Sequence, residues 1–131
     1  MPMNLSQQIG NTQATKTILL VEDDAAIAEL LVQMIVQETH YRLFTVVDGP
    51  QALQIFKDIH PNLLILDYWL PSIHGIELYD RLCYAQGLRQ IPTILLSVNA
   101  PLQEIKKRKM TYMKKPFDVS KLLQTINTLI P

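Results

Sequence analysis

The sequence predicts an α/β protein built on a doubly wound sheet of five parallel strands. Short apolar runs, typical of buried strands, alternate along the chain with segments whose apolar residues recur at helical spacing. This alternation indicates βαβ units, whose right-handed crossovers place helices on both faces of one sheet. We expect the strand order 2-1-3-4-5, with the first strand between the second and the third. The length of 131 residues suits a single hydrophobic core, and the chain contains no internal repeats.

The first half of the chain supplies two strands and two helices. Residues 18–21, Ile-Leu-Leu-Val, read as a buried strand, and apolar residues at helical spacing then extend a helix to about Glu38. Residues 41–46 are expected to form an edge strand. The turn at residues 48–50, Asp-Gly-Pro, places proline at the start of a second helix, which we expect to continue through Ile59 before the next proline stops it.

The second half of the chain supplies three strands and three helices. The apolar run at residues 63–66 predicts a central strand buried on both faces, and a third helix is expected over residues 75–84, ended by Gln-Gly. Short strands are predicted at residues 93–96 and 112–113, with a fourth helix between them. A last helix is expected over residues 118–129.

The composition is that of a small cytoplasmic domain. Residues 1–15 are polar and lack the basic and apolar regions of a signal peptide, so we expect a disordered leader before a domain at residues 16–131. No apolar stretch approaches the roughly 18 residues of a transmembrane helix, so no membrane span is expected. The single cysteine, Cys83, excludes an internal disulfide and lies on an amphipathic helix, where we expect it to pack.

Acidic residues follow two of the buried strands at the points where these strands end. Asp67 closes the run at residues 63–66, and residues 22–24, Glu-Asp-Asp, follow the strand at residues 18–21. Open α/β sheets place their sites at the carboxyl ends of the strands, so two such strands side by side would bring four carboxylates together. Their repulsion would raise their pKa values unless a cation offset it. Mg²⁺, a hard cation that prefers oxygen ligands, is the simplest solution.

A hydroxyl and an ammonium group are expected at the same edge of the sheet. The strand at residues 93–96 leads to Ser97, and the strand at residues 112–113 leads to Lys114 and Lys115. Carboxylates for a metal, one carboxylate free to act as a nucleophile, a hydroxyl and an ammonium together suit a phosphoryl group. The sequence therefore predicts a site that accepts phosphate.

Four segments of the chain, in this order, resemble the receiver domain of two-component response regulators. They are Ile-Leu-Leu-Val-Glu-Asp-Asp, Leu-Asp-Tyr-Trp-Leu-Pro-Ser-Ile-His-Gly, Leu-Leu-Ser and Lys-Lys-Pro-Phe. Each segment alone is weak, but their order is specific, and Ser97 lies thirty residues after Asp67 as in the family. The resemblance covers the chain from about Lys16 to Ile130. It implies a flavodoxin-like fold, Mg²⁺ as the cofactor, and a signalling domain that is not an enzyme.

The resemblance assigns a role to the acidic residues. It makes Asp67 the phosphoacceptor, Asp23 a direct Mg²⁺ ligand and Glu22 a residue that holds the ion through water. The backbone carbonyl of Trp69 would be a further ligand. Asp24 occupies an adjacent acidic position, which in the family is supportive and is not a ligand.

Three further residues match the way in which the family responds to phosphate. Ser97 corresponds to the hydroxyl that hydrogen-bonds a phosphoryl oxygen, and Lys115 corresponds to the lysine that offsets its charge. Tyr112 corresponds to the aromatic switch residue that follows the hydroxyl inward. The implied donor is a histidine kinase or a histidine phosphotransfer protein. An alternative is a receiver-like interaction module that works without phosphorylation.

The chain departs from the family pattern after the fourth strand and beside the acceptor. Ser97 and Lys115 are eighteen positions apart, fewer than is usual in the family, so the fourth helix should be about one turn short. Val98 and Trp69 add bulk beside the acceptor. Either these side chains restrict access to the site, or both turn outward. The short helix and Val98 keep the phosphate-independent alternative open.

The net charge of zero hides an uneven distribution. Residues 1–80 carry ten acidic and three basic groups, whereas residues 81–131 carry two acidic and nine basic groups. The basic run Lys106–Lys109 reads either as a solvated helix face or as a docking patch for an acidic partner. We expect no direct binding of nucleic acid, because neither a recognition helix nor interleaved aromatic residues accompany the run. No Walker A, dinucleotide-binding or nucleophile-elbow motif points to an enzyme.

Overall fold

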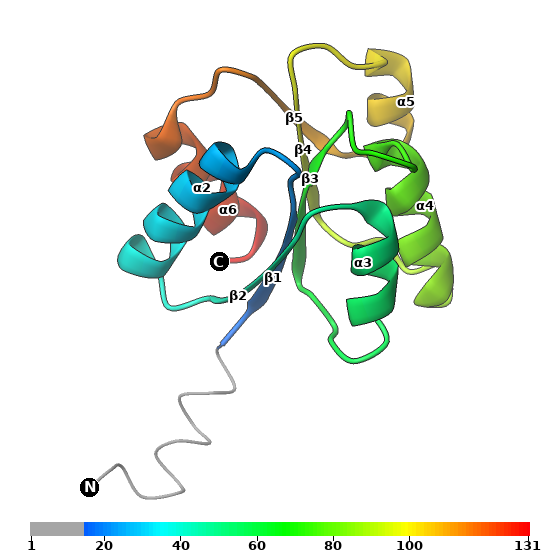
Figure 1. Ribbon diagram of the computed structural model, residues 1–131, viewed down its shortest axis with the longest axis horizontal. Helices are drawn as coiled ribbons and strands as arrows, with labels where there is room; N and C mark the ends of the chain where they lie inside the picture. Colours follow the sequence, from blue (N-terminus) through cyan, green and yellow to red (C-terminus); the bar gives the residue numbers. More distant parts are fainter. Residues whose placement is uncertain (1–14) are drawn as a thin grey trace, which may run out of the picture.

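The computed structural model describes residues 15–131, in which five strands and five helices alternate (Figure 1). The strands are β1 (Thr17–Val21), β2 (Arg42–Val46), β3 (Leu63–Asp67), β4 (Thr93–Ser97) and β5 (Thr111–Lys114). The helices are α2 (Ala25–Glu38), α3 (Gly49–Ile55), α4 (Gly75–Ala85), α5 (Leu102–Lys107) and α6 (Val119–Leu129). The leader predicted at residues 1–15 lies, apart from Thr15, outside the described residues.

The strands form one parallel sheet in the order β2-β1-β3-β4-β5. α2 and α6 cover one face of the sheet, and α3, α4 and α5 cover the other (Figure 1). This arrangement confirms the doubly wound, flavodoxin-like fold predicted from the alternation of elements. Because the strands are parallel, their carboxyl ends meet at one edge, and the loops that follow β1, β3, β4 and β5 begin there.

Alternate residues of the central strands fill two separate cores. Leu19 and Val21 of β1 pack with residues of α3, α4 and α5, while Ile18 and Leu20 pack with residues of α2 and α6. All four are buried, because β1 has a strand on each side and helices on each face. Burial of each such side chain contributes roughly 2 kcal/mol of transfer free energy, which gives the loops a stable frame. Cys83 is also buried, as predicted for a packing residue.

The observed lengths of two helices, α3 and α5, can be compared with the lengths predicted from the sequence. The prediction that the second helix continues through Ile59 was wrong, because α3 ends at Ile55. After Ile55 the hydrogen bonding changes to the 3₁₀ type, because the Asp58 N–H donates to the carbonyl of Ile55, three residues back, at 2.9 Å. α5 has only six residues, which confirms the shortened fourth helix. Within residues 15–131, no helix is long and apolar enough to cross a membrane.

Candidate functional site

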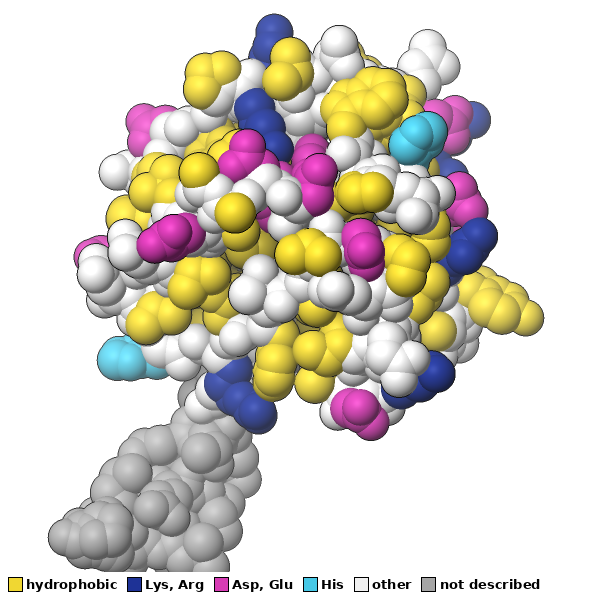
Figure 2. All heavy atoms as spheres, viewed as in Figure 1, with side chains coloured by type: hydrophobic (Ala, Val, Ile, Leu, Met, Phe, Trp, Pro, Cys, Tyr) yellow, Lys and Arg dark blue, Asp and Glu magenta, His cyan; other side chains and the backbone are white. Residues whose placement is uncertain are grey.

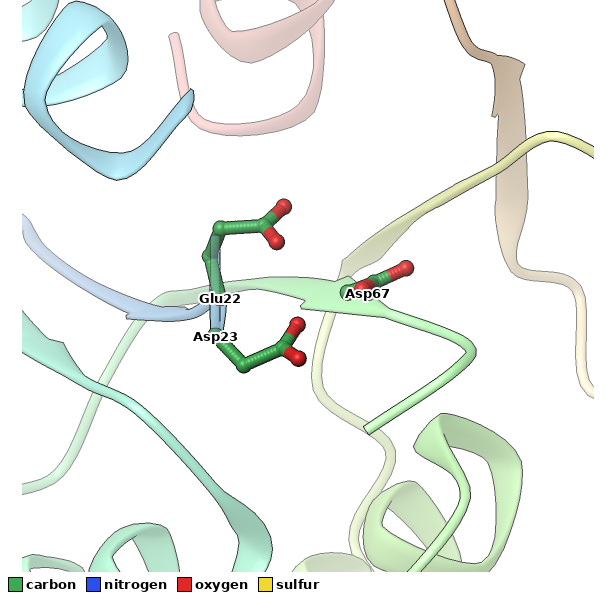
Figure 3. A group of neighbouring side chains, drawn as sticks. All are labelled: Glu22, Asp23 and Asp67. Atoms are coloured by element: carbon green, nitrogen blue, oxygen red, sulfur yellow. The ribbon is translucent and has the colours of Figure 1, made fainter. Parts of the chain in front are cut away.

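Three carboxylates meet at the carboxyl edge of the sheet (Figure 3). The pairing of Val21 with Leu66 sets the ends of β1 and β3 side by side, so Glu22 and Asp23 come next to Asp67. One oxygen from each carboxylate lies within 4.8 Å of the others. Glu22 and Asp67 are buried, whereas Asp23 is exposed. This set of hard oxygen donors fits a divalent cation such as Mg²⁺.

The side chain of Asp24 does not join this cluster. Its Oδ1 accepts hydrogen bonds from the N–H groups of Ala26 at 2.9 Å and Ile27 at 3.1 Å, and so caps the start of α2. The expectation of four converging carboxylates was therefore wrong, because the first turn of a helix leaves N–H groups that a capping carboxylate satisfies. Asp24 contributes instead through its backbone, whose N–H donates to Glu22 Oε2 at 3.1 Å.

Lys115 brings a positive charge to the carboxylates. Its Nζ lies 3.0 Å from Glu22 Oε1, to which it donates a hydrogen bond, and 3.6 Å from Asp67 Oδ1. The residue directly follows β5, and its backbone N–H donates to the Ser97 carbonyl at 2.9 Å. Its peptide bond to the next residue, Pro116, is cis. Strand β5 therefore delivers the lysine predicted for this edge of the sheet.

Burial dominates the electrostatics of the cluster. It raises the pKa of both Glu22 and Asp67, and the Lys115 ammonium opposes this effect only in part. Repulsion between the carboxylates also raises the pKa of both groups, as expected from the sequence, but it is a smaller cause than burial. For Lys115, burial favours the neutral form, but the bond to Glu22 and the nearby carboxylates outweigh burial and raise the pKa. A bound cation would favour the ionised carboxylates.

Ser97 and Tyr112 are linked through the loop that follows β4. The Ser97 hydroxyl is fully buried and donates to the backbone carbonyl of Asn99. The Tyr112 hydroxyl lies 3.0 Å from the carbonyl oxygen of Ser97 and 3.3 Å from that of Val98, and it can donate to either. The two residues that the resemblance pairs as a switch thus contact the same short segment.

Trp69 lies beside Asp67, and its side chain faces solvent. Its backbone N–H donates to Asp67 Oδ1 at 3.4 Å, and its indole N–H donates to Asn99 Oδ1 at 3.3 Å. The ring packs edge-on against Tyr68, with 4.7 Å between the ring centroids. Trp69 is 54% exposed and Val98 is 59% exposed, which agrees with the alternative in which both side chains turn outward.

Gly75 allows α4 to begin directly against the end of β3. Its N–H donates to the Tyr68 carbonyl at 2.8 Å. A Cβ at this position would lie 2.5 Å from the backbone oxygen of Asp67 and 3.0 Å from Leu95 Cδ1. A backbone oxygen cannot yield as the end of a flexible side chain can, so a larger residue would displace the end of the strand that carries Asp67.

Charges on α4 and α5 partly neutralise the basic segment Lys106–Lys109. Arg108 forms two hydrogen bonds of 2.8 Å with the carboxylate of Asp80 on α4. Lys107 Nζ lies 3.2 Å from the carboxylate of Glu104. Lys106 and Lys109 are exposed, and among the described residues neither has an ion-pair partner. The charge available to a partner in this segment is therefore smaller than its sequence indicates.

The fold and the site together define a protein of the receiver class. A doubly wound sheet presents an acidic cluster, a lysine and a hydroxyl at its carboxyl edge. The model of the response regulator receiver domain family matches residues 18–127. The chain belongs to this family, whose members are signalling domains of two-component systems.

Relatives with curated descriptions include a response regulator and a transcriptional regulator. Polar-differentiation response regulator DivK of Brucella ovis is 27% identical over 120 residues, which cover 88% of this chain and 97% of DivK. DNA-binding dual master transcriptional regulator RpaA of Synechocystis is 28% identical over 117 residues, which cover 86% of this chain and 48% of RpaA. The chain thus spans about half the length of RpaA.

Solved structures share the fold. The receiver domain protein (CheY-like) from Methanospirillum hungatei JF-1 matches with a TM-score of 0.79 at 24% identity, covering 88% of this chain and 94% of that one. The signal receiver domain of an HD domain-containing protein from Pseudomonas fluorescens Pf-5 matches with a TM-score of 0.78 at 27% identity, with the same coverage of both chains. These matches confirm the resemblance seen in the sequence.

Two residues at the site, Gly75 and Asn99, make contacts that had no signal in the sequence. Gly75 was part of a recognised segment, but its spacing did not reveal the close approach to Asp67. Asn99 contacts Trp69 across thirty positions and Ser97 through its backbone, so neither contact depends on a pattern of residue types.

Proposed function

We propose that the chain accepts a phosphoryl group on Asp67 from the phosphohistidine of a histidine kinase or a histidine phosphotransfer protein. The observation that carries this proposal is the position of the Asp67 carboxylate, within 4.8 Å of the carboxylates of Glu22 and Asp23 and 3.6 Å from Lys115. A nucleophile, oxygen ligands for Mg²⁺ and a cation for the incoming charge thus lie together. Membership of the receiver family supports this role.

In the transfer, an oxygen of Asp67 attacks phosphorus while the bond between phosphorus and the histidine nitrogen breaks, and the nitrogen keeps the electron pair. Asp23, Glu22 and the backbone carbonyl of Trp69 would hold Mg²⁺, which screens the repulsion between the nucleophile and the phosphoryl oxygens. Lys115 lies close enough to Asp67 to offset part of the added negative charge.

The response to phosphate would pass through Ser97 and Tyr112. The Ser97 hydroxyl would turn to a phosphoryl oxygen, and Tyr112, which contacts the same loop, would change its packing. We expect this to alter the exposure of residues Lys106–Lys109, where an acidic protein partner would bind with salt-sensitive affinity. If the chain receives its phosphoryl group from such a kinase, we expect it to act in the cytoplasm.

A receiver-like interaction module that works without phosphorylation is the second candidate function. The observation that favours it is the length of α5, because a helix of six residues offers less surface for a phosphate-driven change. Mg²⁺-dependent phosphorylation separates the two candidates.

Intact-mass spectrometry after treatment with acetyl phosphate tests the proposal. We expect one phosphoryl adduct with Mg²⁺, and none with EDTA or in Asp67→Asn. The control variant is Asp48→Asn, whose amide oxygen can still cap α3 and which should keep the adduct. An adduct that forms equally well with EDTA, or that survives Asp67→Asn, would contradict the assignment. No adduct from either acetyl phosphate or a phosphohistidine donor would favour the second candidate.

A further inference from the structure

We propose that Asn99 is a positioning residue that couples the phosphoryl site to the indole of Trp69; this inference rests on the phosphoacceptor function proposed above. Asn99 lies in the loop after β4 and makes two contacts of different kinds. Its backbone carbonyl accepts the hydrogen bond of the Ser97 hydroxyl. Its side-chain Oδ1 accepts the indole N–H of Trp69 at 3.3 Å. One residue therefore holds the site hydroxyl on one side and the aromatic ring of the adjacent loop on the other.

The proton of the Ser97 hydroxyl links these contacts to phosphorylation. A serine hydroxyl carries one proton, and here it is donated to the Asn99 carbonyl. To donate to a phosphoryl oxygen on Asp67, the hydroxyl has to release that carbonyl. The backbone of Asn99 then loses the contact that fixes it beside the end of β4, and its amide oxygen loses its fixed position opposite the indole. Phosphorylation therefore releases the indole N–H of Trp69 from Asn99, while the ring keeps its edge-on contacts with Tyr68 and His74.

Before phosphorylation, the contacts with β5 and the residue after it hold Ser97 and Val98 but do not extend to Asn99. The Ser97 carbonyl accepts the backbone N–H of Lys115 at 2.9 Å, and the Tyr112 hydroxyl lies within 3.3 Å of the carbonyl oxygens of both Ser97 and Val98. The two residues before Asn99 are thus held on the side of β5. Asn99 is exposed and is the first residue of the loop beyond these contacts.

The fluorescence of Trp69 can be used to measure its release from Asn99. Trp69 is the only tryptophan of the chain, so its emission can be assigned without ambiguity. Trp69 is already 54% exposed, so a quencher reaches the indole in both states, and release of the indole N–H increases how often the two collide. One partly exposed hydrogen bond shifts the ratio of held to free rings by about two- to tenfold.

Acrylamide quenching of Trp69 fluorescence tests the proposal in three conditions: EDTA, Mg²⁺, and Mg²⁺ with beryllofluoride as the phosphoryl mimic. In EDTA, we expect stronger quenching in Asn99→Ala than in the natural sequence, while Asn99→Asp, which keeps an oxygen acceptor, should restore the weaker quenching. Beryllofluoride should raise the quenching of the natural sequence above the level seen with Mg²⁺ alone. It should produce no such rise in Asn99→Ala or in Ser97→Ala. Gln103→Ala removes an exposed amide from α5 and serves as the matched control.

Equal quenching of the natural sequence and Asn99→Ala in EDTA would overturn the proposed hold on the indole. A beryllofluoride effect of the same size in both proteins would overturn the coupling, as would changes in Gln103→Ala that match those in Asn99→Ala. Fluorine NMR detects bound beryllofluoride independently. The absence of a bound signal in the natural sequence would contradict the phosphoacceptor function, and the comparison in EDTA would still decide whether Asn99 holds the ring.

Discussion

Lys115 Nζ donates a hydrogen bond to Glu22 at 3.0 Å and lies farther, at 3.6 Å, from Asp67, the carboxylate proposed to receive phosphate. The ammonium group thus lies beside the same carboxylates that would bind a metal ion. Because Glu22 and Asp67 are both buried, this positive charge offsets part of the cost of keeping two carboxylates away from water. Its removal should therefore affect the protein most strongly when these carboxylates are ionised.

Lys115→Met should lower the free energy of unfolding near pH 7 in EDTA by about 2 kcal/mol, less than the ~3–5 kcal/mol of fully buried pairs. The loss should shrink near pH 4. The folded protein raises the pKa of Glu22 and Asp67, so their contribution to stability is fully present below the ordinary carboxyl pKa and is lost as the pH rises through the folded values. Urea unfolding at both pH values measures the difference.

The neighbouring lysine provides the control for this variant. Lys114 is exposed, so Lys114→Met should leave the free energy of unfolding almost unchanged at both pH values. If Lys115→Met costs as much near pH 4 as near pH 7, the loss does not come from the interaction of the ammonium group with the ionised carboxylates, and the prediction is wrong.

Mg²⁺ should stabilise the natural sequence against heat. Ligand at 100 times its dissociation constant adds about 2.7 kcal/mol to the free energy of unfolding. We expect Asp23→Asn to lose most of this gain, because it removes one of the three clustered carboxylates. Asp24→Asn is the matched control, since its amide oxygen can still cap α2. Thermal unfolding with Mg²⁺ and with EDTA distinguishes them, and an equal loss in both variants would show that Asp24 also serves the ion.

Gly75→Ala should destabilise the protein by about 2 kcal/mol, because the new Cβ would overlap the backbone oxygen of Asp67. It should also slow phosphorylation by acetyl phosphate, since relief of the overlap moves the end of β3. Gly49→Ala is the control: its Cβ would meet only the side chain of Ile73, at 3.0 Å, which can adjust. Chemical unfolding of the two variants compares them. Equal losses would mean that contact with the strand backbone carries no special cost.

Tyr112→Phe should lower the free energy of unfolding by about 1 kcal/mol, the usual net value of one hydrogen bond. The variant leaves the ring in place but removes the hydroxyl that lies 3.0 Å from the Ser97 carbonyl oxygen. Tyr84→Phe tests the effect of losing a hydroxyl at the surface, since Tyr84 is 75% exposed and should tolerate the change. A Tyr112→Phe protein as stable as the natural one would show that water replaces the hydroxyl without cost.

The residues that meet at the strand ends could be predicted, because a parallel sheet allows few alternative arrangements of neighbouring strands. Once β1 and β3 are neighbours, Glu22 and Asp67 have to emerge together. The orientation of Asp24 could not be predicted in this way, because its carboxylate had two possible partners, a metal cluster and the N–H groups of the next helix. The contacts of Asn99 depend on the path of a loop, which hydrophobic periodicity does not encode. The end of α3 could not be predicted either, because it depends on a local change from α-helical to 3₁₀ hydrogen bonding.

The shortness of α5 has a consequence for the dynamics of the domain. Its six residues follow Pro101 without a side-chain cap, and isolated helices below roughly 12 residues are marginal in water, so α5 depends on tertiary contacts. The main ones are the burial of Ile105 and the bond between Arg108 and Asp80. The amides of α5 should therefore exchange with deuterium sooner than those of α2, through local opening rather than global unfolding. A partner that captures this open form could remodel α5 while the strand that carries Asp67 stays folded.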